Sequence, residues 1–289
     1  MKDICCIGHI TRDKIITPEN EFYQAGGTAL YMAYGFANLP HDVSFGLITK
    51  TGIESADVIS KMRADGIDVV NFDSRSTVYF ENKYGVNSNN RSQRVLAKAD
   101  PFTIDEFANA NAGIFHLGTL LSDDFSPECI EHLAQRGRIS IDVQGYLREV
   151  RGERVVSTKW ADMHRVLAVT SILKLNEKEK DAISNFTDPR DVARELAALG
   201  VEEVVLTLGS EGSLIYAHRE FYDIPAYKPA KLVDATGCGD TYSTGYLYAR
   251  MRGAGYAEAG RFAAAMCTLK LEHCGPFDRT VDDINAILA

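Results

Sequence analysis

The sequence predicts an α/β protein with a mostly parallel central sheet that helices cover on both faces. Short apolar runs rich in β-branched residues alternate with helical patterns, and two long helical patterns close the chain of 289 residues. Alternation of this kind favours a parallel sheet flanked by helices. The predicted strands are residues 4–10, 42–48, 66–72, 113–117, 138–142, 171–175 and 204–208. The predicted helices include residues 26–39, 239–252 and 256–273, with another between the second and third strands.

Three further helix starts carry local signals. The segment from Thr103 to Glu106 has the spacing of a capping box, in which the threonine caps the helix and the glutamate reaches back to it. Ser126 and Asp188 each precede a proline, so a capping side chain stands before a residue suited to the first helical position. These signals predict helices that begin after residues 103, 126 and 188.

Two polar, strand-prone segments interrupt the alternation. Residues 12–23 and 76–98 lie between core elements, and the second contains Asn87-Ser-Asn-Asn90 flanked by β-compatible residues, which indicates a hairpin. We expect these segments to form a small β-sheet that projects from the core as a lid; ordinary surface loops are the alternative. No internal repeat or linker divides the chain, so residues 1–289 are predicted to form one domain with this lid.

Composition narrows the class of partner. The net charge of −9 argues against a nucleic-acid or acidic-membrane surface, which would present a basic face, but one phosphate pocket needs only local donors. None of the six cysteines has zinc-site spacing, and a disulfide scaffold is not expected in a chain of this length, so a reducing cytoplasm fits best. No apolar stretch resembles a signal peptide or approaches the ~18 residues of a transmembrane helix.

The strongest local signal is Asp234-Ala-Thr-Gly-Cys-Gly-Asp240, directly before a helical pattern. Glycines ahead of a helix let backbone N–H groups converge on an anion, and the helix dipole favours negative charge there. A phosphoryl group in transfer spreads charge over its oxygens, which such a turn could hold. Asp240 beside the turn could accept the proton of an attacking hydroxyl. An ordinary helix start with an aspartate in its first turn is the alternative.

This motif resembles the D-T-x-G-A-G-D signature of the ribokinase-like (PfkB) carbohydrate kinases. The resemblance implies a ribokinase-like three-layer α/β core with a small β-sheet lid. It also implies ATP as the phosphoryl donor, Mg²⁺ as a cofactor and a hydroxyl group as the acceptor. Other segments resemble the family's motifs in the same order along nearly the whole chain: the di-glycine at Gly26-Gly27, N-x-x-E at Asn176–Glu179 and T-x-G-x-x-G at Thr207–Gly212.

By position, the resemblance makes Asp240 the general base of the reaction. It implies that Asn176 and Glu179 organise Mg²⁺, largely through water. Taken alone, these two residues also have the spacing of a helix-capping pair, and the two roles are compatible. The implied anion hole consists of the backbone N–H groups of Gly237, Cys238, Gly239 and Asp240. The implied nucleotide-binding residues are Thr207, Gly209, Gly212 and Asn176, although Thr207 onward also fits a plain strand end with a turn.

On the acceptor side, the resemblance implies that Asp13 binds acceptor hydroxyls and that Gly26 and Gly27 form a hinge against the acceptor. Alone, Asp13 would be a surface residue and the two glycines a turn. Tyr31 stands where the family often has asparagine, so we expect an acceptor pocket that differs from a ribose site. Residues 142–148 stand where many sugar kinases carry D-P-N, and Arg148 within them could shape the pocket together with Gln144.

The backbone around Asp234 and Thr236 resembles a site that holds a monovalent cation such as K⁺ in many members. The predicted function is an ATP-dependent kinase for a sugar or sugar-like polyol, with a homodimer formed through the lid. A nucleoside kinase of the same fold and an inositol-kinase-like enzyme are the alternatives. Residues 142–148, with Gly8-His9 and Tyr31, are similar to the inositol-kinase-like members. A sensor that binds sugar or nucleotide without turnover is a further alternative, against which the intact Asp240 argues.

Overall fold

The computed structural model describes residues 1–85 and 91–289, and within them the core is a nine-stranded sheet. The strand order is β15-β14-β13-β12-β9-β8-β1-β4-β5. Neighbours pair in parallel from β5 to β13, whereas β14 and β15 extend the edge as antiparallel strands. The strands are β1 Lys2–Gly8, β4 Phe45–Thr51, β5 Val69–Asp73, β8 Ala112–Gly118, β9 Arg138–Asp142, β12 Ile172–Asn176, β13 Glu203–Thr207, β14 Ser213–Ala217 and β15 Glu220–Ile224.

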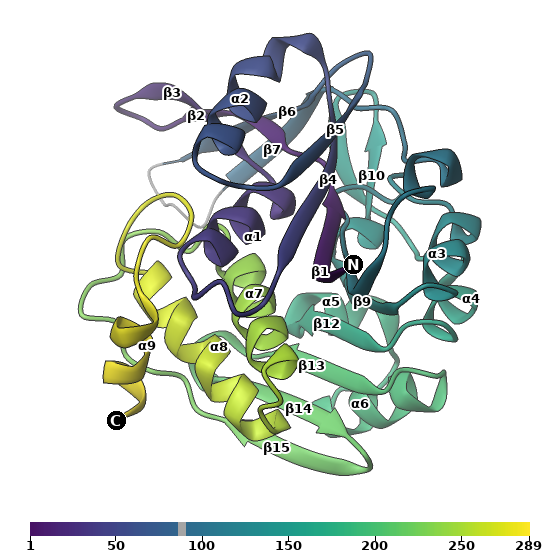
Figure 1. The fold of residues 1–289 in the computed structure, drawn as a ribbon, viewed down its shortest axis with the longest axis vertical. Helices are drawn as coiled ribbons and strands as arrows, with labels where there is room; N and C mark the ends of the chain where they lie inside the picture. Colours follow the sequence, from purple (N-terminus) through teal and green to yellow (C-terminus); the bar gives the residue numbers. More distant parts are fainter. Residues whose placement is uncertain (86–90) are drawn as a thin grey trace.

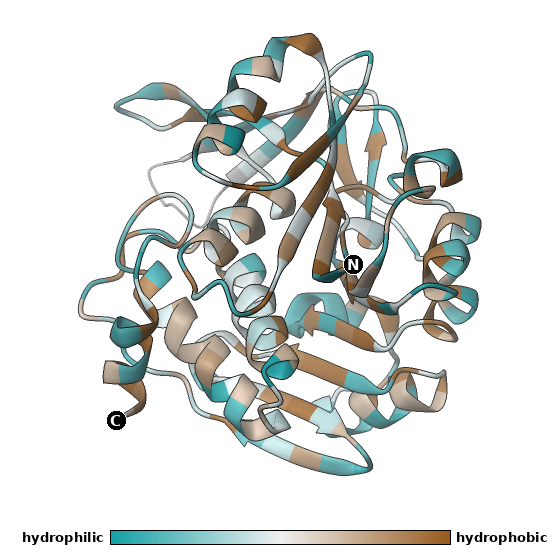
Figure 2. Cartoon of the chain, in the orientation of Figure 1, coloured by the Kyte–Doolittle hydropathy of each residue, from teal (hydrophilic) through white to brown (hydrophobic). Residues whose placement is uncertain are grey.

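Helices cover both faces of this sheet, which confirms the predicted three-layer α/β core (Figure 1). Alternate residues of β1 explain the two faces: Ile4 and Cys6 pack into one hydrophobic cluster, and Cys5 and Ile7 into the other. Figure 2 shows the central strands in the hydrophobic colours, as expected for strands buried on both faces. The first face carries α1 Thr28–Ala37, α2 Ala56–Ala64, α7 Cys238–Met251, α8 Tyr256–Lys270 and α9 Val281–Leu288. The second carries α3 Pro127–Ala134, α4 Met163–Leu167, α5 Glu177–Ile183 and α6 Pro189–Ala198.

The predicted helix starts at Ser126 and Asp188 are confirmed. Ser126 and Asp188 cap α3 and α6 through side-chain oxygens that accept backbone N–H bonds. The capping box at Thr103 and Glu106 is also present, but it opens only a single 3₁₀ turn, η2 Ile104–Phe107, instead of an α-helix. The carboxylate of Glu106 also pairs with the buried Lys50 ammonium at 2.6 Å, so this turn anchors a loop to the core.

A second, mostly antiparallel sheet lies at one end of the core, at the top of the view in Figure 1. Its strands, in spatial order, are β10 Arg148–Arg151, β11 Arg154–Ser157, β7 Arg91–Ala97, β6 Val78–Tyr84, β2 Thr11–Ile16 and β3 Glu21–Gly26. Residues 12–23 and 76–98 contribute four of these strands, while β10 and β11 were not predicted.

The pairing of β6 with β7 matches the predicted hairpin, although Asn87–Asn90 itself lies outside the described residues. That this second sheet acts as a lid on a single domain stays a prediction. Among the described residues, no helix combines the length and the apolar character needed to cross a membrane.

Candidate active site

The motif from Asp234 to Asp240 folds as a tight turn that leads into α7. The Asp234 carboxylate accepts a hydrogen bond from the Thr236 N–H at 2.9 Å, which closes the start of the turn. Gly237 caps the helix with φ +76°, a conformation that favours glycine. A Cβ atom on Gly237 would lie 2.1 Å from Cδ1 of Tyr31. Glycine is therefore required here both by the backbone angle and by the tyrosine ring beneath the turn.

The first turn of α7 supplies backbone N–H groups that have no partner within the helix. Of the four predicted anion-hole donors, the Cys238 N–H donates to the Ala235 carbonyl at 3.2 Å, within the turn itself. Gly239 is exposed at the start of the helix. Because the helix dipole also favours negative charge at this end, the turn can hold a phosphoryl group. The anion-hole role of the four residues stays a prediction.

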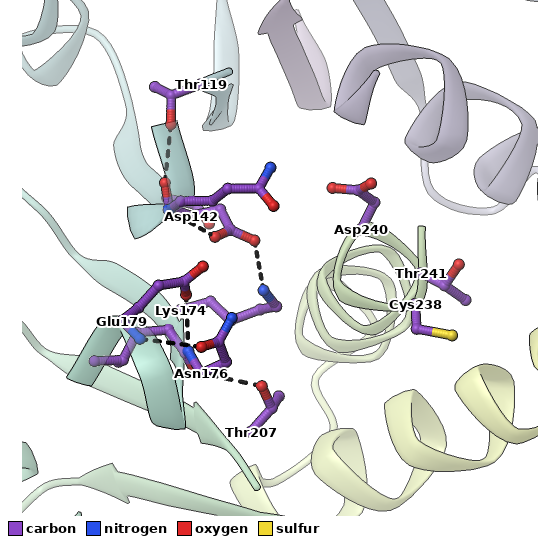
Figure 3. A network of polar contacts seen from close by, with 12 residues as sticks. Thr119, Asp142, Lys174, Asn176, Glu179, Thr207, Cys238, Asp240 and Thr241 are labelled. Atoms are coloured by element: carbon purple, nitrogen blue, oxygen red, sulfur yellow. Dashed lines mark hydrogen bonds and ion pairs between the residues drawn. The ribbon is translucent and has the colours of Figure 1, made fainter. Parts of the chain in front are cut away.

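Asp240 occupies the third position of α7 and points toward Asp142 (Figure 3). It is partly buried and accepts a hydrogen bond from the side chain of Thr28, the first residue of α1. The starts of α1 and α7 therefore meet at this carboxylate. Burial and the negative charge of Asp142 raise the pKa of Asp240 to about 6, against the lowering effects of Thr28 and Lys174. A carboxylate with such a pKa is ionised at neutral pH and still basic enough to accept a proton.

A buried ion pair faces Asp240 from the sheet. Lys174 on β12 and Asp142 at the end of β9 are register neighbours, and Nζ lies 2.5 Å from Oδ2. Both side chains are 8% exposed. Although burial opposes ionisation of both groups, their mutual attraction lowers the pKa of Asp142 and raises the pKa of Lys174. A Cβ atom on Gly239 would lie 3.3 Å from the Lys174 Nζ, so the ammonium lies directly against the turn.

Lys174 was missed from the sequence. The signal that could have found it is a lysine inside an apolar strand, because lysine is almost never fully buried without a partner. It also lies two residues before Asn176 on β12, so both side chains project from the same face of that strand.

Asn176 and Glu179 form the capping box that their spacing allows. The Asn176 side chain accepts from the Lys178 and Glu179 N–H groups, and the Glu179 carboxylate accepts from the Asn176 N–H at 2.9 Å. Burial and the charge of Asp142 raise the pKa of Glu179, while Lys174 lowers it. The carboxylates of Asp142 and Glu179 together carry more negative charge than the Lys174 ammonium neutralises. This surplus fits Mg²⁺, which retains waters and binds one or two carboxylates together with substrate phosphates. Within the described part of the chain, no cluster of His, Cys, Asp or Glu could hold a metal by itself.

The predicted nucleotide loop begins beside Asn176. Thr207 ends β13 as the register partner of Asn176, and both are seen at the edge of the site in Figure 3. Gly209 and Gly212 have φ angles of +57° and +98°. A Cβ atom on Gly212 would lie 2.1 Å from the Ile224 carbonyl oxygen, so glycine is needed where the loop turns back into β14. The structure thus brings the predicted magnesium and nucleotide residues together.

The predicted acceptor residues lie where the second sheet meets α1. Asp13 on β2 is paired across the ladder with Gln24 of β3, two residues before Gly26. A Cβ atom on Gly26 would lie 2.4 Å from the Asp13 carboxylate, and one on Gly27 would lie 2.6 Å from the His9 carbonyl. The two glycines therefore permit the close approach of β2 to the start of α1.

Tyr31 and Arg148 have different surroundings. Tyr31 is 4% exposed and its ring supports Gly237 from below, so it belongs to the hydrophobic core. Arg148 donates to the Gln144 side chain at 3.0 Å, and its positive charge lowers the pKa of Asp240. Direct contact of either residue with an acceptor stays a prediction.

Comparison with known proteins agrees with this geometry. The chain is 27% identical to a cytidine kinase of Thermococcus kodakarensis over 97% of its own length and 100% of the relative. A solved sulfate complex of a pyrophosphate-dependent kinase in the ribokinase family superposes with a TM-score of 0.88, at 26% identity, over 98% of this chain and 99% of the other.

A structure of a pyrophosphate-dependent kinase in the ribokinase family with a pyrophosphate analogue and myo-inositol superposes with a TM-score of 0.87, at 25% identity, covering 98% and 99% of the two chains. Residues 1–279 match the family described as pfkB family carbohydrate kinase. With its ribokinase-like fold and this match over nearly all of its length, the chain belongs to the pfkB family of carbohydrate kinases.

Proposed function

We propose that this chain transfers a phosphoryl group to a hydroxyl of a sugar or sugar-like polyol, with Asp240 as the general base. The observation that carries the proposal is the place of Asp240: a partly buried carboxylate in the first turn of α7, with a pKa raised to about 6 by burial and by Asp142. Asp240 takes the proton of the attacking hydroxyl, and the N–H groups of the turn hold the charge that develops on the phosphoryl oxygens.

Lys174 and Glu179 complete the donor side in this proposal. The Lys174 ammonium lies against Gly239, where it can neutralise a phosphate oxygen, while Asp142 holds it in place through the 2.5 Å pair. Glu179 and Asn176 would hold Mg²⁺, largely through water, and the metal would neutralise charge on the donor phosphates. The second sheet would act as a lid that excludes water from the reaction.

ATP is the proposed donor, on the strength of the Thr207–Gly212 loop. Pyrophosphate is the second candidate, because the solved structure with a TM-score of 0.88 is of a pyrophosphate-dependent kinase. The acceptor candidates follow in the same way: sugars from the family, myo-inositol from the complex at 25% identity and cytidine from the archaeal relative at 27% identity.

Phosphorus NMR of every pairing between two donors and three acceptors tests the proposal. ATP and pyrophosphate are each incubated with ribose, myo-inositol and cytidine in the presence of Mg²⁺, and the phosphorylated alcohol is identified from its resonance. We expect one acceptor to be phosphorylated far faster than donor hydrolysis in its absence. No transfer in any pairing, extended to a wider panel of sugars and polyols, would overturn the proposed activity.

We also propose a homodimer formed through the second sheet. Within the described residues, β3 is an edge strand of that sheet, and it exposes Phe22 to 45% and Tyr23 to 59%. An exposed edge with two aromatic side chains is suited to pairing with a second copy. Light scattering on the wild type and on a Phe22→Lys variant should give a dimer and a monomer respectively. A monomeric wild type would refute the dimer without affecting the proposed activity.

A further inference from the structure

Lys270 is the last residue of α8 and is fully buried. It lies beside the turn that runs from Asp234 into α7, called the phosphate turn below. Its side chain is 0% exposed. The ammonium donates to the Asp234 carbonyl oxygen at 3.1 Å, to the His273 carbonyl oxygen at 3.2 Å and to the Asp234 carboxylate at 3.4 Å. An ammonium has three donors, so these oxygens account for its whole bonding capacity. A lysine is rarely buried to this extent without such partners.

These contacts join the phosphate turn to the chain that follows α8. Asp234 begins the turn, and its second carboxylate oxygen already fixes the Thr236 N–H at 2.9 Å. The backbone links the two segments through the Leu271 carbonyl, which accepts from the Val233 N–H at 2.8 Å and from the Asp234 N–H at 3.3 Å. The buried ammonium adds a side-chain link to the carbonyl and the carboxylate of Asp234. Lys270 therefore helps to set the position of the N–H groups at the start of α7.

A monovalent cation was expected at the backbone of Asp234 and Thr236, and the residues present do not fit one. The Asp234 carbonyl oxygen that such an ion would need already binds the Lys270 ammonium. A second cation on the same oxygen would lie within a few ångströms of Nζ, where like charges repel strongly away from bulk water. Carbonyl oxygens can replace the hydration shell of K⁺ in proteins, and here the same kind of oxygen surrounds an ammonium.

We propose that Lys270 is a positioning residue whose ammonium takes the place of a monovalent cation, so that turnover requires neither K⁺ nor Na⁺. The positive charge is part of the chain and cannot dissociate, and it holds Asp234 and the His273 segment in the arrangement that presents the turn to phosphate. The proposal rests on the proposed kinase activity for its kinetic test, but it also predicts how the turn binds an anion in the absence of an acceptor.

The test compares Lys270→Ala, which removes the charge and leaves room, with Lys270→Met, which removes the charge and fills the space. Initial rates are measured at about 0.1 M ionic strength, set with tetramethylammonium, K⁺, Na⁺, ammonium or ethylammonium chloride, so that screening is constant. We expect the wild-type rate to be the same in all five salts. Lys270→Ala should lose about 10²-fold in kcat in tetramethylammonium, the cost of misplacing catalytic groups by about 1 Å. Ammonium, ethylammonium or K⁺ should restore it, whereas Lys270→Met should stay impaired in every salt.

Measuring pyrophosphate binding tests the role of Lys270 without any assumption about which reaction the protein catalyses. The rise in melting temperature caused by inorganic pyrophosphate reports anion binding at the turn even if no acceptor is known. We expect this rise to be independent of K⁺ in the wild type, reduced in Lys270→Ala, and recovered with ethylammonium. A wild type that needs K⁺ for turnover or for pyrophosphate binding would overturn the proposal, even if neither variant folds. A folded Lys270→Ala variant that keeps full activity, or that no small cation restores, would overturn it as well.

Discussion

Replacing Asp240 with asparagine should slow turnover by several orders of magnitude and at the same time stabilise the protein. Asparagine has almost the same shape, and its amide oxygen can still accept the hydrogen bond from Thr28 that the carboxylate receives. It cannot take a proton from an alcohol. Loss of a general base typically costs about 10²–10⁴-fold in rate, and we expect a reduction of this size in kcat.

The gain in stability follows from the raised pKa of Asp240. Burial and the charge of Asp142 raise this pKa from 3.8 to about 6, so the folded protein disfavours the ionised form. The favourable contribution of the neutral acid is present below pH 4 and is lost as the pH rises through 6. A shift of about two pKa units corresponds to about 3 kcal/mol, and we expect about half of that because the side chain is partly exposed to solvent. The asparagine variant should therefore be about 1–2 kcal/mol more stable at pH 8 and no more stable near pH 4.

Urea denaturation at pH 8 and pH 4.5, together with kinase rates, checks both effects. Asp73→Asn is the matched control, because Asp73 is an exposed carboxylate at the end of β5. We expect the control to keep its activity and to show no gain in stability at pH 8. The reasoning is refuted if Asp240→Asn is less stable than the wild type at pH 8, or if its gain is the same at both pH values. Full turnover by the variant would refute the role as general base.

Three further outcomes follow from the site. The wild-type kcat/KM should rise as the pH increases through about 6, because Asp240 must be ionised to act as a base; a flat profile between pH 5 and 8 would contradict this. Lys174→Met should lower the free energy of unfolding by about 3–5 kcal/mol, because it leaves the Asp142 carboxylate buried and unpaired. Adding Asp142→Asn should recover the stability but not the activity, and a double variant that is fully active in kinase assays would contradict this. Gly237→Ala should lose both stability in urea and turnover, because a Cβ atom would lie 2.1 Å from the ring of Tyr31; wild-type behaviour would show that the turn can shift at no cost.

The core strands were predictable because each is a short apolar run that the sheet buries on both faces. β10 and β11 were not, since each has only four residues, Arg-Glu-Val-Arg and Arg-Val-Val-Ser, without a clear strand pattern. They become strands by pairing with each other, and β11 also pairs with β7. β14 and β15 were also missed as the antiparallel extension of the sheet. Their hairpin turn places His218 and Arg219 at positive φ without the glycine that usually signals it.

Some residues of the candidate site could also be found from the sequence, whereas others are revealed only by the fold. Glycine spacing before a helix is a local pattern, so the turn ending at Asp240 could be found in the sequence. The partner of Lys174 is 32 residues away along the chain, and the two Asp234 oxygens beside Lys270 come from a turn 36 residues earlier, so local patterns do not show either contact. Tyr31 could be noticed as a departure from the family motif, but only the fold shows that its ring lies beneath Gly237.

The meeting of α1 and α7 at one carboxylate has a consequence for biosynthesis. Thr28 and Asp240 lie far apart in the sequence, and β1, which is translated before the strands beside it, lies inside the sheet between β8 and β4. A ribosome-bound chain can therefore bury β1 early, yet it cannot assemble the proposed phosphoryl-transfer site until α7 has emerged. Contacts of such long sequence separation form late and slowly. The appearance of kinase turnover during synthesis or refolding would thus report the final long-range docking step, not the collapse that precedes it.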